Sequence, residues 1–253
     1  MRVFVTGATG HIGSAVVADL LAAGHDVVGL VRSGDSAAAL ENAGGEPLPG
    51  SLEDVETLRE AAAAADGVIH LAYMHNPPAN ADAAAVDLGA IEALGAGLED
   101  SGKPFVGTSG TLTLPQGRIG TEADPPDPNA PAGGRAAAEN AAVRLAQRGV
   151  RSSVVRLPPT VHSSLDHHGF IPRLIDIARE KRAAAYIAEG TNRWPAVHTL
   201  DAARVFRLAL ESPPAASRSH AALPRWPWLS PAPLRLSPAT SRSRAKPARN
   251  AAA

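Results

Sequence analysis

Three glycines near the N-terminus have the spacing with which a loop can hold a diphosphate. Gly7, Gly10 and Gly13 lie between an apolar run at residues 2–6 and a segment with apolar residues on one helical face. Glycine permits a tight turn and a close approach of the backbone, and the N–H groups at a helix start stabilise negative charge. The motif therefore predicts a dinucleotide site, with a purely structural turn as the alternative. The residues expected at its centre are Gly7, Thr9, Gly10, His11, Ile12 and Gly13.

Arg32 predicts which dinucleotide binds. An NAD site usually places an acidic residue after the second strand, where it holds the ribose hydroxyls. Here Val31 is followed by Arg32, and the next acid is Asp35. A guanidinium can pair with a 2′-phosphate and stack on adenine. NADP is therefore the favoured cofactor, NAD stays an alternative, and an arginine that contacts only solvent is a further interpretation.

Other residues that could do chemistry give weaker signals. His162, His167 and His168, with Asp166, invite a metal interpretation, but they lack the helical spacing of metal ligands, so we expect no metal site. Ser109 lies in Thr-Ser-Gly-Thr rather than in a Gly-x-Ser-x-Gly elbow, so no nucleophilic triad is indicated. The chain has no cysteine, which excludes disulfides and thiolate chemistry.

Short apolar segments alternate with helical ones along residues 1–211. Such a pattern predicts βαβ units and an α/β fold with a doubly wound parallel sheet, in the order 3-2-1-4-5-6. That order places the proline-containing third strand on an edge, where prolines are tolerated. Ser51 and Asp54 form a capping-box pattern before the third helix. Strands are expected at 2–6, 27–31, 46–49, 68–71, 105–108 and 153–157, and helices at 12–21, 51–65, 84–99, 135–148, 170–181 and 200–210.

The last 42 residues differ in composition from the rest. Residues 212–253 contain eight prolines and seven Lys or Arg, and they contain no Asp or Glu, whereas the net charge of the whole chain is −1. We therefore expect two parts, a domain at 1–211 and a disordered basic tail at 212–253. The alternatives are an arm that binds nucleic acid or a partner through Trp226 and Trp228, and an end that is translated out of frame.

Composition limits the remaining classes. Hydrophobic residues make up 45% of the 253 residues, enough for a sizeable core, and no window holds 18 uninterrupted apolar residues. We expect a soluble, cytoplasmic protein that acts on a small molecule and binds neither membrane nor nucleic acid. A homodimer is the alternative to a monomer.

The motifs together resemble a known superfamily. Thr6–Ser14 (TGATGHIGS) followed by VVGLVRS is similar to the short-chain dehydrogenase/reductases, specifically to their extended and atypical NAD(P)-dependent epimerases/dehydratases. The resemblance covers residues 1–211 and implies a Rossmann fold with a reduced C-terminal substrate lobe. It also implies cofactor contacts in the segments after the third, fourth, fifth and sixth strands, at Ser51, Leu52, Leu71, Ala72, Tyr73, Thr108 and Pro158.

The catalytic pair of that superfamily is missing. Its members normally use Tyr-x-x-x-Lys, but the best alignment places Pro131 and Arg135 on these positions, and neither tyrosine of the chain has Lys four residues later. The resemblance implies that Arg135 holds the nicotinamide ribose and supplies positive charge, and that Ser109 orients the substrate oxygen. Glu139 is either part of an Arg-x-x-x-Glu motif or a helix-surface acid. Further candidates to replace the tyrosine are Tyr73, His75 and Thr111.

Two functions follow as hypotheses. The first is an NAD(P)-dependent oxidoreductase or epimerase that transfers hydride at a carbonyl or a secondary alcohol. The second is an NADP-binding regulatory module with little or no turnover, which the missing pair favours. The sequence names neither the substrate nor the direction of the reaction.

Overall fold

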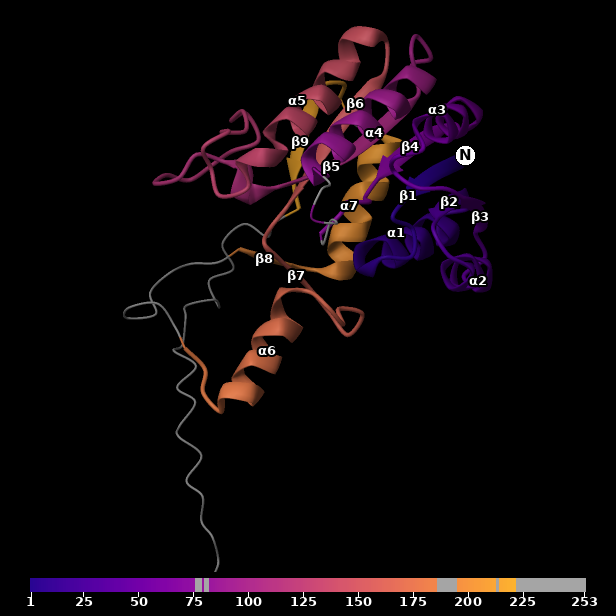
Figure 1. Ribbon diagram of the computed structural model, residues 1–253. Helices are drawn as coiled ribbons and strands as arrows, with labels where there is room; N and C mark the ends of the chain where they lie inside the picture. The colour runs from indigo at the N-terminus through magenta and orange to yellow at the C-terminus, as the bar shows by residue number, and fades with distance from the viewer. Residues whose placement is uncertain (76–78, 80–81, 186–194, 213, 222–253) are drawn as a thin grey trace, which may run out of the picture.

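The computed structural model describes residues 1–75, 79, 82–185, 195–212 and 214–221. Its centre is a parallel sheet in the order β3-β2-β1-β4-β5-β6-β9 (Figure 1). The first six positions confirm the predicted order, and β3, which contains Pro47 and Pro49, lies on the edge as expected. The strands are β1 (Arg2–Thr6), β2 (Asp26–Val31), β3 (Glu46–Pro49), β4 (Gly67–His70), β5 (Pro104–Gly110), β6 (Arg151–Leu157) and β9 (Ser217–His220).

Helices cover both faces of this sheet, which confirms a doubly wound Rossmann-like fold. One buried cluster joins the sheet to α3, α4 and α5, and a second joins it to α1, α2 and α7. Both clusters consist mainly of Val, Leu, Ile and Ala, as the scarcity of aromatic residues requires. These helices are α1 (His11–Ala22), α2 (Gly34–Asn42), α3 (Val55–Ala64), α4 (Ala83–Gly97), α5 (Ala136–Arg144) and α7 (Thr199–Glu211).

The sheet continues beyond residue 211, where a tail was expected. β9 pairs in parallel with β6, and the Ala216 N–H donates to the Ser152 carbonyl at 2.8 Å. Ser217–His220 contains no proline, so each of its backbone N–H groups can take part in pairing with β6. The described part of the fold therefore includes β9, and residues 222–253, with Trp226 and Trp228, lie outside the described residues.

Two local predictions were wrong. The Ser51 hydroxyl accepts the Glu53 N–H, and Asp54 alone caps α3 by accepting from the N–H and hydroxyl of Thr57, so the helix begins after Asp54 rather than at Ser51. The predicted helix at 135–148 is split into the 3₁₀ turn Gly133–Arg135, α5, and a second 3₁₀ turn at Leu145–Arg148 that ends at the left-handed Gly149.

A small second lobe stands apart from the sheet (Figure 1). It consists of the two-stranded parallel sheet β7 (Thr160–His162) and β8 (Ala196–His198), together with α6 (Phe170–Lys181). No residue of α6 is buried, and Phe170, Leu174 and Ile177 are each more than 40% exposed. Within the described residues, no helix is both long and apolar enough to cross a membrane.

Candidate dinucleotide cleft and active site

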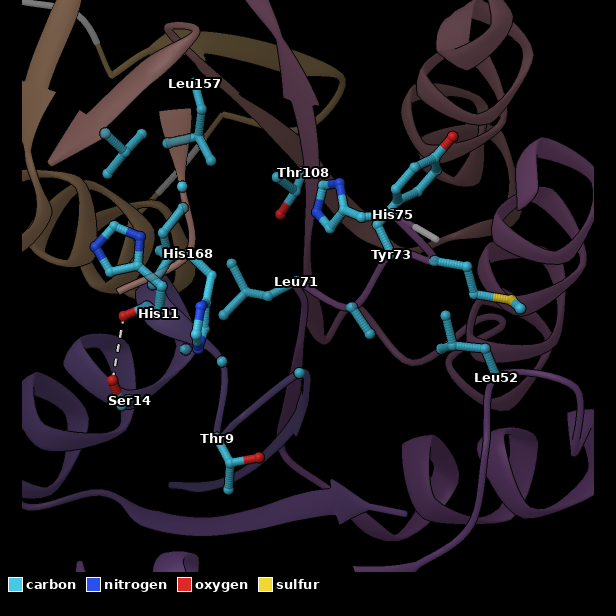
Figure 2. A pocket seen from close by; sticks show the side chains of 18 of the residues that line it. Thr9, His11, Ser14, Leu52, Leu71, Tyr73, His75, Thr108, Leu157 and His168 are labelled. Atoms are coloured by element: carbon cyan, nitrogen blue, oxygen red, sulfur yellow. Dashed lines mark hydrogen bonds between the residues drawn. The ribbon is translucent and has the colours of Figure 1, made fainter. Parts of the chain in front are cut away.

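A cleft of about 1370 Å³ lies at the carboxyl ends of the strands (Figure 2). Parallel sheets bind ligands at this edge, near the point where the strand order reverses, here between β1 and β4. The structure brings together in the cleft every residue that the sequence predicts for cofactor binding: Gly7, Thr9, Gly10, His11, Ile12, Gly13, Arg32, Ser51, Leu52, Leu71, Ala72, Tyr73, Thr108, Arg135 and Pro158. We call the lining residues within 7–135 the sheet wall and those within 157–173 the lobe wall.

The glycine loop leaves room for a ligand but none for side chains. Gly7 has φ +71°, and a Cβ at this position would lie 2.8 Å from the Ala72 nitrogen. A Cβ at Gly13 would lie 1.9 Å from the Gly7 carbonyl oxygen, so α1 can pack on the loop only with glycine there. No side chain caps the N-terminus of α1, which begins after Gly10. The N–H groups of its first turn therefore remain for an anion, and this geometry fits a dinucleotide diphosphate.

Arg32 lines the cleft between β2 and α2. It is exposed and forms no ion pair with another described residue. Ser36 lines the cleft next to it, while Ser33 is engaged in capping α2 through the Ser36 N–H at 3.2 Å. Glu53 is the single acid among the described lining residues, and it follows β3. This end of the cleft therefore presents a guanidinium and hydroxyls at the place where NAD sites usually hold an acid.

Four side chains of the sheet wall gather where β4 and β5 end. The Arg135 guanidinium lies 4.3 Å from the centre of the Tyr73 ring and donates to the Thr108 carbonyl at 3.2 Å. The rings of Tyr73 and His75 meet edge to face with centroids 5.2 Å apart, and Figure 2 shows both near Thr108. Burial, helped by the positive charge of Arg135, lowers the pKa of His75. The cluster combines a hydroxyl, an imidazole and a cation.

A chain of buried polar side chains leads from Arg135 through Asp87 and His70 to Thr6 and holds Arg135 in position. Asp87 on α4 is 1% exposed, and its Oδ2 lies 3.6 Å from the guanidinium of Arg135. Its Oδ1 lies 3.1 Å from His70 Nε2, and His70 Nδ1 lies 2.8 Å from the hydroxyl of Thr6. The Nε atom of Arg135 is buried and has no hydrogen-bond partner among the described residues. Sequence reasoning missed Asp87; an acid on the otherwise apolar face of 84–97 was the signal that could have indicated it.

The expected catalytic role of Ser109 does not agree with the structure. Ser109 is 2% exposed and does not line the cleft, whereas its neighbour Thr108 does. Successive residues of a strand point to opposite faces of a sheet, and Ser109 lies on the α5 face, beside Glu139. We therefore assign it no substrate contact. Thr111, also considered, lies in a 3₁₀ turn and does not line the cleft either.

Glu139 is not a helix-surface acid. It is 3% exposed and pairs with Arg156 at 2.5 Å and with Arg218 of β9 at 2.8 Å. Although burial opposes it, hydrogen bonds, first of all from Arg156, hold the pKa of Glu139 below its ordinary value. Arg156 also donates to the carbonyls of Thr121 and Asp124. This network joins α5, β6, β9 and the loop after β5 behind the active site.

The loop before α6 is held by hydrogen bonds of Asp166, one of them shared with His162, while the rings of His167 and His168 meet edge to face. Asp166 accepts the Gly169 N–H at 2.7 Å and lies 3.0 Å from His162 Nδ1. His11 connects this loop to the sheet wall, since its Nδ1 lies 3.8 Å from Asp166 and its Nε2 lies 2.8 Å from the Thr199 hydroxyl. Burial lowers the pKa of His11, although Asp166 opposes this. The described part of the chain contains no group of three metal-ligating side chains.

Comparisons with known proteins agree with this architecture. The model of the NAD dependent epimerase/dehydratase family matches residues 3–221. Uncharacterized protein C2A9.02 of Schizosaccharomyces pombe is 48% identical over 87% of this chain and 74% of its own. Uncharacterized protein YLL056C of Saccharomyces cerevisiae is 41% identical over 83% of this chain and 71% of its own. A farnesyl-dihydroquinoline-oxide ketoreductase of Stigmatella aurantiaca is 34% identical over 72% of this chain and 56% of its own.

Solved structures share the fold. The dTDP-glucose 4,6-dehydratase DesIV of Streptomyces venezuelae, crystallised with NAD, has a TM-score of 0.71 at 22% identity, covering 87% of this chain and 75% of its own. A dTDP-glucose 4,6-dehydratase of Bacillus anthracis in complex with NAD has a TM-score of 0.70 at 18% identity, covering 88% of this chain and 75% of its own. At these identities the similarity extends to the fold and no further.

Proposed function

The chain belongs to the NAD dependent epimerase/dehydratase family, and from this premise we propose that it is an NADP-dependent oxidoreductase that interconverts a carbonyl and a secondary alcohol. The observation that carries the proposal is the cleft, which is lined by all fifteen predicted cofactor positions, including the clustered Tyr73, Thr108 and Arg135. The 34% identical relative named as a ketoreductase supports a ketone as the substrate.

Each part of the sheet wall has a proposed role. The glycine loop and the start of α1 hold the diphosphate, and Arg32 holds the 2′-phosphate, which is the reason for preferring NADP to NAD. Arg135 holds the nicotinamide ribose through its terminal nitrogen Nη1, because Asp87 and the Thr108 carbonyl both contact Nη2. When bound, the cofactor supplies or accepts a hydride at the nicotinamide ring.

Tyr73 is the proposed proton donor to the substrate oxygen. Its phenol replaces the tyrosine that the superfamily places at the position of Pro131, and it reaches the cleft from the segment after β4 instead. A cation 4.3 Å from the ring centre stabilises the negative charge that the phenol acquires when it donates its proton. His75 contacts the same ring and is the second candidate, because its lowered pKa favours the neutral imidazole that can accept a proton from an alcohol.

Calorimetric titration with NADP and NAD tests the cofactor assignment. A charge-assisted contact is worth about 1.5–3 kcal/mol, so Arg32→Ala should weaken NADP binding by roughly 10- to 150-fold and leave NAD binding nearly unchanged. Arg179→Ala, an exposed arginine of α6 outside the cleft, is the control. A wild type that prefers NAD, or a variant that loses both cofactors equally, contradicts the role of Arg32.

Consumption of NADPH separates the enzyme from the second candidate, a regulatory module that binds NADP without turnover. The absence of a tyrosine four residues before Arg135 is the observation that favours this second candidate. Turnover with any member of a panel of aliphatic, aromatic and prenylated ketones establishes the oxidoreductase. Tight NADP binding supports the regulatory module if neither the ketones of the panel nor nucleotide sugars are turned over.

A further inference from the structure

The lobe wall presents nitrogen-containing side chains to the cleft beside the glycine loop. His167, His168 and Arg173 all line the cleft, and the lobe wall contributes no acid to the lining. Arg173 forms no ion pair with any residue in the part of the chain that the structure describes. Figure 2 shows His168 and His11 both turned into the pocket above Thr9. The side chains of His168 and Arg173 therefore have capacity for a ligand with several anionic oxygens.

Internal contacts hold this part of the lobe wall beside the glycine loop. Asp166 is 6% exposed and does not line the cleft, because its carboxylate is used by the Gly169 N–H and by His162. Although burial opposes it, these hydrogen bonds keep the pKa of Asp166 below its ordinary value, so the group is a carboxylate at neutral pH. Its proximity to His11 connects the loop before α6 to the first residue of α1.

We propose that His168 and Arg173 form the second half of the diphosphate site, contacting the dinucleotide from the lobe wall beside the start of α1. The proposal rests on the proposed cofactor binding and adds residues that the glycine motif does not include. A diphosphate carries charge on several oxygens, and the N–H groups of one helix turn can reach only one side of it. A guanidinium and an imidazole of the lobe wall pair with the remaining oxygens.

A separate anionic group of the substrate could use the same chemistry, and affinity measurements distinguish the two sources. We compare Kd values for NADP and NAD, by calorimetry without substrate, for wild type, His168→Ala, Arg173→Ala and the double variant. Both single substitutions lie on exposed residues, and thermal unfolding verifies that the fold is kept. Arg179→Ala, on the same helix but outside the cleft and 77% exposed in its side chain, is the matched control.

The expected pattern differs from that of Arg32→Ala. Arg173→Ala should weaken NADP and NAD by the same factor, about tenfold or more, and His168→Ala should weaken both by roughly three- to tenfold. Arg179→Ala should change neither affinity. Unchanged affinities in the double variant overturn the proposal and assign these side chains to a substrate group or to solvent. If the wild type binds neither dinucleotide, the proposed function itself fails, and this inference fails with it.

Discussion

The two walls of the cleft differ in what supports them. The sheet wall follows strands whose side chains form two buried clusters, and its glycines pack so closely that a Cβ at Gly13 would lie 1.9 Å from a carbonyl oxygen. The lobe wall continues into α6, which has no buried residue and exposes the apolar side chains of Phe170, Leu174 and Ile177. A few polar contacts of Asp166 and His11 connect it to the sheet wall.

The comparison teaches that the two walls of the cleft depend on the core to different extents. Because the sheet wall is part of the core, the free energy that folds the domain also fixes the phosphate loop and the reactive cluster. The proposed ligand contacts of the lobe wall would depend little on the core, since α6 has no buried residue. Substitutions in the sheet wall should therefore affect stability and rate as well as cofactor affinity, whereas substitutions in the lobe wall should affect cofactor affinity with little change in stability.

The largest expected effect is on the rate, at the sheet wall. Tyr73→Phe keeps the ring beside Arg135 and removes only the hydroxyl, so kcat should fall by about 100- to 10,000-fold, the usual contribution of general acid catalysis. The Kd for NADP should stay within about twofold, since the ring contact remains. Tyr186→Phe, at the other tyrosine of the chain, is the control. An unchanged kcat in Tyr73→Phe would transfer the role to His75.

The next effect is on stability, at the network behind the sheet wall. Glu139→Ala leaves the fully buried Arg156 without its carboxylate, which should lower the free energy of unfolding by about 3–5 kcal/mol. Glu99→Ala breaks the exposed pair with Arg148 and should cost about 1 kcal/mol or less. Urea titrations of both variants and of the wild type measure the two changes in the free energy of unfolding. Equal losses would show that the Glu139 network contributes no more than a surface pair.

Two leucine substitutions compare the helices behind the two walls, α4 and α6. Leu94→Ala, on α4 at 0% exposure, should destabilise by about 2–5 kcal/mol. Leu174→Ala, on α6 at 46% exposure, should stay within about 0.5 kcal/mol. Thermal unfolding gives both values. A large loss at Leu174 would mean that the apolar face of α6 is covered in solution, and the contrast between the walls would then be smaller than the structure indicates.

The smallest effects come from a pair of helical glycines. Gly13→Ala pushes a methyl group into the Gly7 carbonyl and should destabilise by about 1–3 kcal/mol while abolishing tight cofactor binding. Gly89→Ala, on α4 with open space around the new Cβ, should instead stabilise by about 0.5–1 kcal/mol. Differential scanning calorimetry with and without NADP measures both. A stable, NADP-binding Gly13→Ala protein would disprove the tight-turn argument.

The sequence by itself determined the parts that depend on local pattern. Alternating apolar segments and the prolines of residues 46–49 predicted the strand order, and the glycine spacing and Arg32 predicted one end of the cleft. It could not determine where the sheet ends, because the four residues of β9 carry no apolar pattern and form a strand only beside β6.

The tertiary structure decided which polar groups meet. The sequence placed Ser109 at the active site, but the alternation of β5 turns it towards Glu139 and leaves Thr108 in the cleft. Glu139 is buried because Arg156 and Arg218 arrive from strands that follow it along the chain. His11 contacts Thr199 across 188 positions of sequence. Local patterns record backbone conformation and burial over a few residues, whereas charge pairing and the facing of cleft walls depend on how distant elements pack.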